Sequence, residues 1–233
     1  MPKARYMAQT IILTAALAAG AAACGSSASS DPLAGLTSTQ IARQAVTGTE
    51  AASSVRIYGQ GSDSGQPLSI DLTIVKGKGC QGSLSQGNVG SFKLVYSGGT
   101  VWVLPDSQFY QANNVPAAAQ AILNGKWLEV KSTASGLGSI ANLCTMSTLL
   151  GQFTADAGSA KGVKTTLNGQ PAVKITDNTD KGYAYVTDTA PPQLLQVTKP
   201  GAGGGTINFS YNTTTTITPP PASQVIDGSK YGF

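Results

Sequence analysis

The strongest constraint on the fold is an alternation of apolar and polar residues with a period of two, which begins at Val55. Successive side chains of a β-strand point to opposite faces, so such an alternation predicts a strand with one apolar face. Two alternating runs are separated by the turn-forming segment GQGSDSGQP, which predicts an antiparallel hairpin. The apolar residues of the second run are Leu68, Ile70, Leu72 and Ile74.

Further strands are predicted along most of the chain. Gly98-Gly99 separates two alternating runs in SFKLVYSGGTVWVL, and Asn168-Gly169 in VKTTLNGQPAVKIT is a strong hairpin signal. Each of these turns joins neighbouring strands, which favours a meander. The other predicted strands are residues 126–131 (KWLEVK), 182–187 (GYAYVT), 194–199 (LLQVTK) and 206–211 (TINFSY).

Three segments favour helices. Thr37 and Gln40 fit a capping box that starts a helix ending near Ala52, and a short alanine-rich helix is predicted over 115–123. A third helix is predicted over 137–153, with Cys144 on its apolar stripe and facing the sheet. Together the elements predict an α+β fold: a single large curved antiparallel sheet with helices gathered on one face.

Composition limits the chemistry of this chain. It has 233 residues, enough for one domain with a sizeable core, and only 11% of them are charged. Histidine is absent, which excludes Ser-His-Asp and histidine-zinc sites. Without Lys3 and Arg5 of the first 23 residues, 13 basic and 11 acidic side chains leave a net charge of +2. We therefore expect no nucleic-acid partner.

The N-terminal segment resembles the signal of a bacterial lipoprotein. A basic start precedes an apolar run over 7–23, and Ala21-Ala22-Ala23-Cys24 is similar to a lipobox, in which the cysteine is diacylated and becomes the mature N-terminus. We expect a signal peptide over 1–23, a lipidated flexible tether over 24–36 and a folded domain over 37–233. The alternatives are an ordinary signal peptide cut after an A-x-A site and a membrane-spanning helix.

The other two cysteines, Cys80 and Cys144, form an even pair in a chain that is expected to be exported. An oxidising compartment favours a disulfide between them. Two buried thiols or a metal site are the alternatives, although two cysteines without histidine cannot supply four zinc ligands.

Other chemical motifs lack the context they need. GKGCQG matches G-x-G-x-x-G but no helix is predicted after it, so turn glycines are favoured over a dinucleotide site. Asp177, Asp180 and Asp188 are either a calcium loop or solvated turn carboxylates. Asp71, Asp106 and Glu129 could serve a hydrolase, but nothing selects a pair.

Trp102 and Trp127 either pack in the sheet or line a cavity. We expect no catalytic residues, no metal and no cofactor.

The order of segments resembles actinobacterial lipoproteins of the LppX/LprAFG family. The similarity runs from the lipobox through SVRIYGQGSDSGQPLSIDLTI, VYSGGTVWVL, GKWLEV and LNGQPAVKIT to ITPPPASQVI. The resemblance implies a half-open β-barrel like that of the LolA-type carriers, with helices over its concave face and an apolar cavity for a lipid or acylated glycolipid. Expected cavity residues are Leu68, Ile70, Leu72, Ile74, Val101, Val103, Ile140 and Leu143.

This resemblance also implies a location and partners. The protein would sit on the outer face of the bacterial cell membrane through its acylated Cys24 and carry lipid across the envelope, with an envelope transporter or sensor protein as a possible partner. The alternative is a tethered protein-binding or stress-sensing module of the same fold that holds no lipid.

Replacing Cys24 with Ala tests the anchor. Two acyl chains hold a protein stably on a bilayer, so we expect the Cys24→Ala variant to leave the membrane fraction while the wild-type chain stays in it. The measurement is membrane fractionation followed by immunoblotting. Continued membrane association of the variant would contradict the lipobox interpretation.

Overall fold

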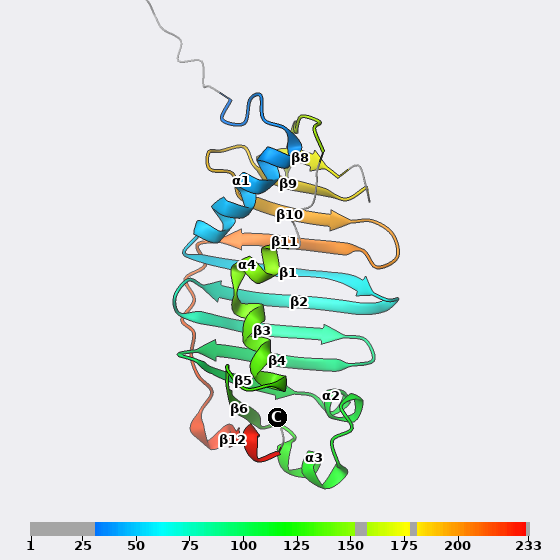
Figure 1. Cartoon of the computed structure of the whole chain (residues 1–233), viewed down its shortest axis with the longest axis vertical. Helices are drawn as coiled ribbons and strands as arrows, with labels where there is room; N and C mark the ends of the chain where they lie inside the picture. Colours follow the sequence, from blue (N-terminus) through cyan, green and yellow to red (C-terminus); the bar gives the residue numbers. More distant parts are fainter. Residues whose placement is uncertain (1–30, 152–157, 178–180, 232–233) are drawn as a thin grey trace, which may run out of the picture. The chain divides into compact units, whose positions relative to one another are not determined.

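A 12-stranded sheet forms the framework of the computed structural model, which describes residues 31–151, 158–177 and 181–231 (Figure 1). The spatial order is β12-β6-β5-β4-β3-β2-β1-β11-β10-β9-β8-β7. The strands are β1 (Ser54–Asp63), β2 (Gln66–Val75), β3 (Gly79–Gln86), β4 (Gly90–Ser97), β5 (Thr100–Pro105), β6 (Trp127–Lys131), β7 (Val163–Leu167), β8 (Gln170–Thr176), β9 (Tyr183–Thr187), β10 (Leu194–Lys199), β11 (Gly205–Tyr211) and β12 (Val225–Asp227).

The sheet consists of two meanders joined in the middle. Strands β1 to β6 follow one another as neighbours, as do β7 to β11, and β1 pairs antiparallel with β11 between them. This confirms the predicted α+β fold with one large sheet. One feature was not expected: β12 pairs parallel with β6, which makes the sheet mixed. Its three residues are too few to show an alternation in the sequence.

Helix α1 (Ser38–Ala51) begins and ends close to the predicted bounds. The Thr37 side chain accepts a hydrogen bond from the Gln40 backbone N–H, and the Gln40 side chain accepts one from the Thr37 N–H, so the capping box is formed. Ile41 and Ala45 are buried, and the helix contacts β8 and β10. The buried side of α1 therefore packs against the sheet.

Three hydrogen bonds among polar groups tie α1 to the sheet. The Leu194 backbone N–H donates to Thr49 Oγ1 at 3.0 Å, and the Tyr211 hydroxyl donates to the Leu194 carbonyl. Because Tyr211 has a single proton to give, Thr49 Oγ1, 2.9 Å away, donates to the Tyr211 oxygen. Burial raises the pKa of Tyr211. The network joins α1, β10 and β11 with each hydroxyl both donating and accepting.

The predicted helix over 137–153 is wrong as a single element. A 3₁₀ helix, η1 (Gly136–Cys144), is followed by α4 (Met146–Leu150), and the two are separated by Thr145. Thr145 has extended backbone angles (φ −100°, ψ 111°), which an α-helix cannot contain. Residues 152 and 153 lie outside the described ranges. The short helix α3 (Ala117–Leu123) is confirmed, whereas α2 (Ser107–Ala112), capped by Asp106, was not predicted.

The predicted disulfide is present and joins η1 to the sheet. Cys80 of β3 and Cys144 at the end of η1 are bonded, with a Cα–Cα distance of 5.4 Å and a sequence separation of 64 residues. Both are buried. Helices α1, η1 and α4 lie over the same face of the sheet, which we call the inner face (Figure 1).

Glycines allow unusually close contact between β1 and β11. A Cβ placed on Gly59 would lie 2.1 Å from the carbonyl oxygen of Thr206, and one on Gly205 would lie 2.4 Å from Gly61 Cα. No side chain fits at such distances. The centre of the sheet therefore requires glycine where backbones approach most closely.

Gly59→Ala tests this requirement. We expect the substitution to lower the free energy of unfolding by about 1–3 kcal/mol, because a strand must shift to admit the methyl group. Gly151→Ala is the matched control, since a Cβ there meets nothing within 4 Å, and we expect a change within about 0.5 kcal/mol. Chemical denaturation followed by tryptophan fluorescence measures both. Equal stabilities of the two variants would contradict the close-contact argument.

Removal of the disulfide is a second test of the fold. For a loop of this length the chain-entropy model predicts that a Cys80→Ala, Cys144→Ala double variant loses about 4 kcal/mol of unfolding free energy. Denaturation of the oxidised wild type, the reduced wild type and the double variant measures the loss. A double variant as stable as the oxidised protein would show that the bond does not hold η1 against the sheet.

Candidate functional site

The inner face of the sheet carries parallel rows of apolar side chains that run across the strands. One row, the buried row, is made by residues that pair across neighbouring strands, with Gly82 of β3 between Leu72 and Leu94, and each of its side chains has an exposure of 5% or less. This row forms the centre of the core beneath the helices. Its members are Phe209, Ile57, Leu72, Leu94, Val103 and Leu128.

A second row lies two residues away from the first on each strand, always toward the same ends of the strands. We call it the half-buried row. Its pairs are also direct, for example Val197 with Ile207 and Ile70 with Leu84. All its side chains are apolar, and all are partly exposed. In the middle of the row Gly59 pairs with both Ile207 and Ile70 and contributes no side chain. The members are Val197, Ile207, Ile70, Leu84 and Phe92.

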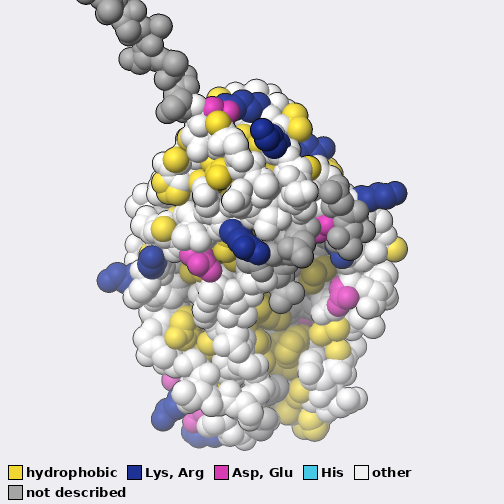
Figure 2. Space-filling view, turned by 45° about the horizontal axis from the view of Figure 1, so that its top comes forward, with side chains coloured by type: hydrophobic (Ala, Val, Ile, Leu, Met, Phe, Trp, Pro, Cys, Tyr) yellow, Lys and Arg dark blue, Asp and Glu magenta, His cyan; other side chains and the backbone are white. Residues whose placement is uncertain are grey.

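The helices explain why burial changes between the two rows. Helices α1, η1 and α4 cross the sheet over one half of the strands, and no other helix of the described residues lies in front of the other half of β1 to β3 (Figure 1). Figure 2 shows hydrophobic side chains gathered in a hollow on this side of the molecule. The half-buried row is therefore continuous with the core and is itself only partly buried.

The structure brings the expected cavity residues onto one face but to different depths. The strand residues Leu72, Ile74, Val101 and Val103 are at most 5% exposed, so they belong to the packed core. The remaining expected residues are half-buried; they are Leu68, Ile70, Ile140 and Leu143. Of the expected set, Ile70 lies in the half-buried row.

Several residues of the half-buried row were missed from the sequence. Leu84 lies in β3, which was not predicted because the segment GCQGSLSQ is rich in glycine and serine. Val197 and Ile207 lie on predicted strands, but nothing in the sequence indicated that these strands pair with the first hairpin through β1 and β11. The alternation of Leu84 with Ser83 and Ser85 was the available signal.

A second concavity lies at the opposite ends of the strands, and we call it the edge cleft. It has a volume of about 620 Å³ and includes apolar surface from Ile74, Tyr96 and Met146. Lys76 and Lys78 lie on its rim, and the Lys76 ammonium donates to the Glu50 carbonyl at 3.3 Å. Cys144 of the disulfide also lines it. The edge cleft can contact apolar and anionic groups at the same time.

The carboxylates that were considered for hydrolysis have structural partners. Asp71 accepts two hydrogen bonds from Arg56, which hold the pKa of its carboxyl below the ordinary value. Asp106 caps α2 and accepts hydrogen bonds from Ser91, while Glu129 accepts one from the Trp102 indole at 2.8 Å. These three carboxylates are thus engaged separately rather than as a catalytic pair.

The tryptophans do not line the inner face. Trp102 alternates with the buried Val101 and Val103, and Trp127 precedes the buried Leu128, so both side chains lie on the opposite face. The cavity alternative for them is wrong in this fold.

The calcium loop considered as an alternative to turn carboxylates lies partly outside the described residues. Asp180 lies outside the described residues, and Asp188 forms an ion pair with Lys164 at 3.0 Å. Within residues 31–151, 158–177 and 181–231 there is no group of three His, Cys, Asp or Glu side chains that could hold a metal.

The expected lipid attachment site, Cys24, also lies outside the described residues, as does the expected signal peptide. Among the helices that the structure describes, none combines the length and apolar character needed to cross a membrane.

Comparison with known proteins gives a likeness in structure. No family model matches the sequence, and no curated protein matches it. LprF from Mycobacterium bovis superposes with a TM-score of 0.52 at 12% identity, over 78% of this chain and 96% of LprF. The lipoprotein LppX from Mycobacterium tuberculosis gives 0.43 at 14% identity, over 78% of this chain and 98% of LppX. The fold of this chain is that of LprF, as the resemblance in the sequence predicted.

Proposed function

We propose that this protein is a membrane-tethered, extracytoplasmic lipoprotein that binds the acyl chains of a lipid or acylated glycolipid. The observation that carries the proposal is the half-buried row, a band of aliphatic and aromatic side chains beside the core with a gap at Gly59. Exposed contiguous apolar surface on a polar protein marks a site for a ligand or partner. The fold shared with LprF agrees with the family resemblance of the sequence, which implies a cavity for acyl chains.

The energetics suit a carrier. Burial of an acyl chain stabilises it by about 0.8 kcal/mol for each CH₂ group, whether the chain enters a protein or a bilayer. A ligand held against the half-buried row would therefore exchange with a membrane at little net cost. Gly59 leaves room at the centre of the row, between Ile70 and Ile207. The function needs no catalytic residue and no cofactor.

The N-terminal segment supplies the location in this proposal. Cys24, once diacylated, would hold the protein on the outer face of the cell membrane, with residues 24–36 as a tether. Transport across the envelope then follows if the domain takes lipid from this membrane and delivers it to an acceptor, such as an envelope transporter.

Native mass spectrometry of the purified full chain tests lipid binding. We expect co-purifying acyl species that organic extraction removes. Ile70→Asn places an amide in the half-buried row, and desolvating it should lower lipid occupancy about tenfold. Ile122→Asn is the matched control, because Ile122 is 53% exposed on α3, away from the row.

Two outcomes would contradict the proposal. An empty wild-type protein that also takes up no lipid from vesicles would exclude a carrier and favour the tethered protein-binding module. Equal lipid occupancy in the Ile70→Asn and Ile122→Asn variants would move the ligand away from the half-buried row.

A further inference from the structure

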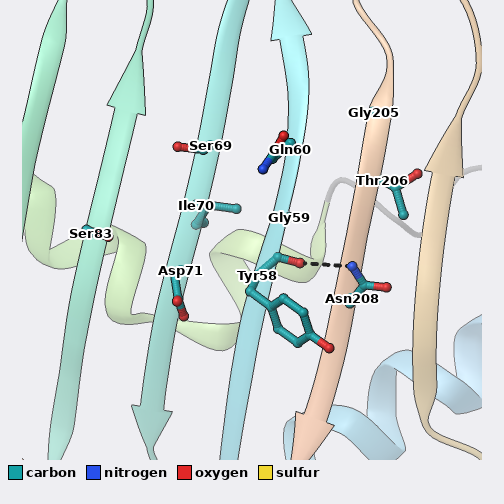
Figure 3. A pocket seen from close by; sticks show the side chains of 10 residues that line it. All are labelled: Tyr58, Gly59, Gln60, Ser69, Ile70, Asp71, Ser83, Gly205, Thr206 and Asn208. Atoms are coloured by element: carbon teal, nitrogen blue, oxygen red, sulfur yellow. Dashed lines mark hydrogen bonds between the residues drawn. The ribbon is translucent and has the colours of Figure 1, made fainter.

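The face of the sheet opposite the helices carries a pocket of its own. It has a volume of about 630 Å³ and lies across β11, β1, β2 and β3. Figure 3 looks onto this face, with α1 and the η1–α4 segment behind the strands. The side chains of Tyr58 on β1 and Asp71 on β2 project from the strands on this face. Register pairing confirms that these two side chains share a face with Asn208 and Ser83.

A second pocket continues the first toward β5. Its volume is about 390 Å³, and it shares Ser69 and Ser83 with the first pocket. We call the two together the outer groove, which runs from Asn208 on β11 past Ser83 to Lys93 on β4 and Leu104 on β5. Five steps between strands at about 4.8 Å make it roughly 24 Å long.

The lining of the outer groove combines polar and apolar surface and is almost uncharged. Its polar side chains are Ser, Thr, Asn, Gln and Tyr, and its apolar residues are Ile70, Leu84, Phe92, Leu104 and Pro105. Ile70, Leu84 and Phe92 border the groove from their strands, although the register directs their side chains to the inner face. Asp71 is neutralised by the two hydrogen bonds of Arg56, at 2.7 and 2.8 Å, and Asp106 is used to cap α2. Lys93 is the remaining charged side chain that the structure places in the lining.

Hydrogen bonds hold the polar groups of the first pocket in place. The Arg56 guanidinium lies 4.7 Å from the centre of the Tyr58 ring while it binds Asp71. The Gln196 amide donates to Asn208 Oδ1 at 2.9 Å, and Asn208 Nδ2 donates to the Tyr58 carbonyl at 3.4 Å. An aromatic ring, a carboxylate and an amide are thus oriented before any ligand arrives.

These groups match the chemistry of an uncharged sugar chain. A tyrosine ring offers an apolar surface for the C–H face of a pyranose and a hydroxyl for hydrogen bonding. Amide, carboxylate and hydroxyl groups can donate to and accept from neighbouring sugar hydroxyls. A groove that crosses many strands suits an extended polymer better than a compact small molecule.

Other extended ligands fit less well. A peptide gains affinity from a sheet by pairing with an open edge, whereas the strands under the outer groove are already paired on both sides. A nucleic acid requires several Lys or Arg side chains facing its phosphates, and the lining supplies Lys93. An acyl chain would leave the hydroxyl and amide groups desolvated.

We propose that the outer groove binds a linear neutral polysaccharide. Because the half-buried row lies on the other face of the sheet, lipid and glycan would be held at the same time by different sides of the same strands. The protein would then contact a neutral glycan of the envelope while its inner face holds lipid.

Isothermal titration calorimetry tests the glycan site with the full chain in a polyoxyethylene detergent, which carries no sugar. The probes are the neutral hexasaccharides cellohexaose, maltohexaose and laminarihexaose, with hexagalacturonate and a ten-residue Ser/Thr-rich peptide for comparison. We expect saturable binding of at least one neutral hexasaccharide with a Kd below about 1 mM, and weaker binding of the anionic sugar and the peptide.

Variants locate the binding. Tyr58→Ala should weaken hexasaccharide binding about tenfold, Tyr58→Phe should retain the stacking contribution, and Tyr231→Ala, an exposed tyrosine outside the groove, should change nothing. Ser83→Trp places a large side chain where the two pockets meet. It should weaken hexasaccharide binding about tenfold and leave disaccharide binding within about twofold, because each pocket remains open.

Circular dichroism and thermal unfolding confirm that each variant folds. The proposal is overturned if no neutral hexasaccharide binds, if the peptide binds more tightly than all of them, or if folded Tyr58→Ala and Ser83→Trp proteins both bind like the wild type.

Discussion

The antiparallel pairing of β1 with β11 is the interaction on which the rest of the structure depends. It joins two meanders that each contain only neighbouring strands and so turns them into one sheet. It also brings Gly59 so close to the Thr206 carbonyl that no side chain fits there. On the inner face this leaves room in the half-buried row, and on the other face it sets Tyr58 beside Asn208.

Both candidate sites follow from the same alternation of side chains. Each strand gives every second residue to the core and the residue between to the opposite face. Ile70 and Asp71 are neighbours in sequence, and the register directs the Ile70 side chain to the half-buried row and the Asp71 side chain to the face of the outer groove. Two ligands of opposite chemistry can therefore be served without a second domain.

Much of the fold was predictable because its signals are local. The Thr37 capping box, the Asn168-Gly169 turn and the alternation over 68–74 each specify a short segment, and each is present as predicted. The misses have non-local or weak causes. Strand β3 is stabilised by its neighbours rather than by the residues of GCQGSLSQ, and Thr145 interrupts a helical pattern that periodicity alone predicts to continue.

The candidate sites were harder to predict than the fold, for a physical reason. Sequence patterns distinguish apolar from polar faces, but not a covered apolar face from an accessible one. Leu72 and Ile70 have the same pattern, and only the position of the helices makes the first fully buried and the second half-buried. Likewise Ser69 and Ser83 resemble ordinary solvent-facing residues until the register places them in one groove with Tyr58. The exposure of an apolar row in this fold depends on where the covering helices end, and that position depends on contacts between segments more than a hundred residues apart, such as α1 with β10.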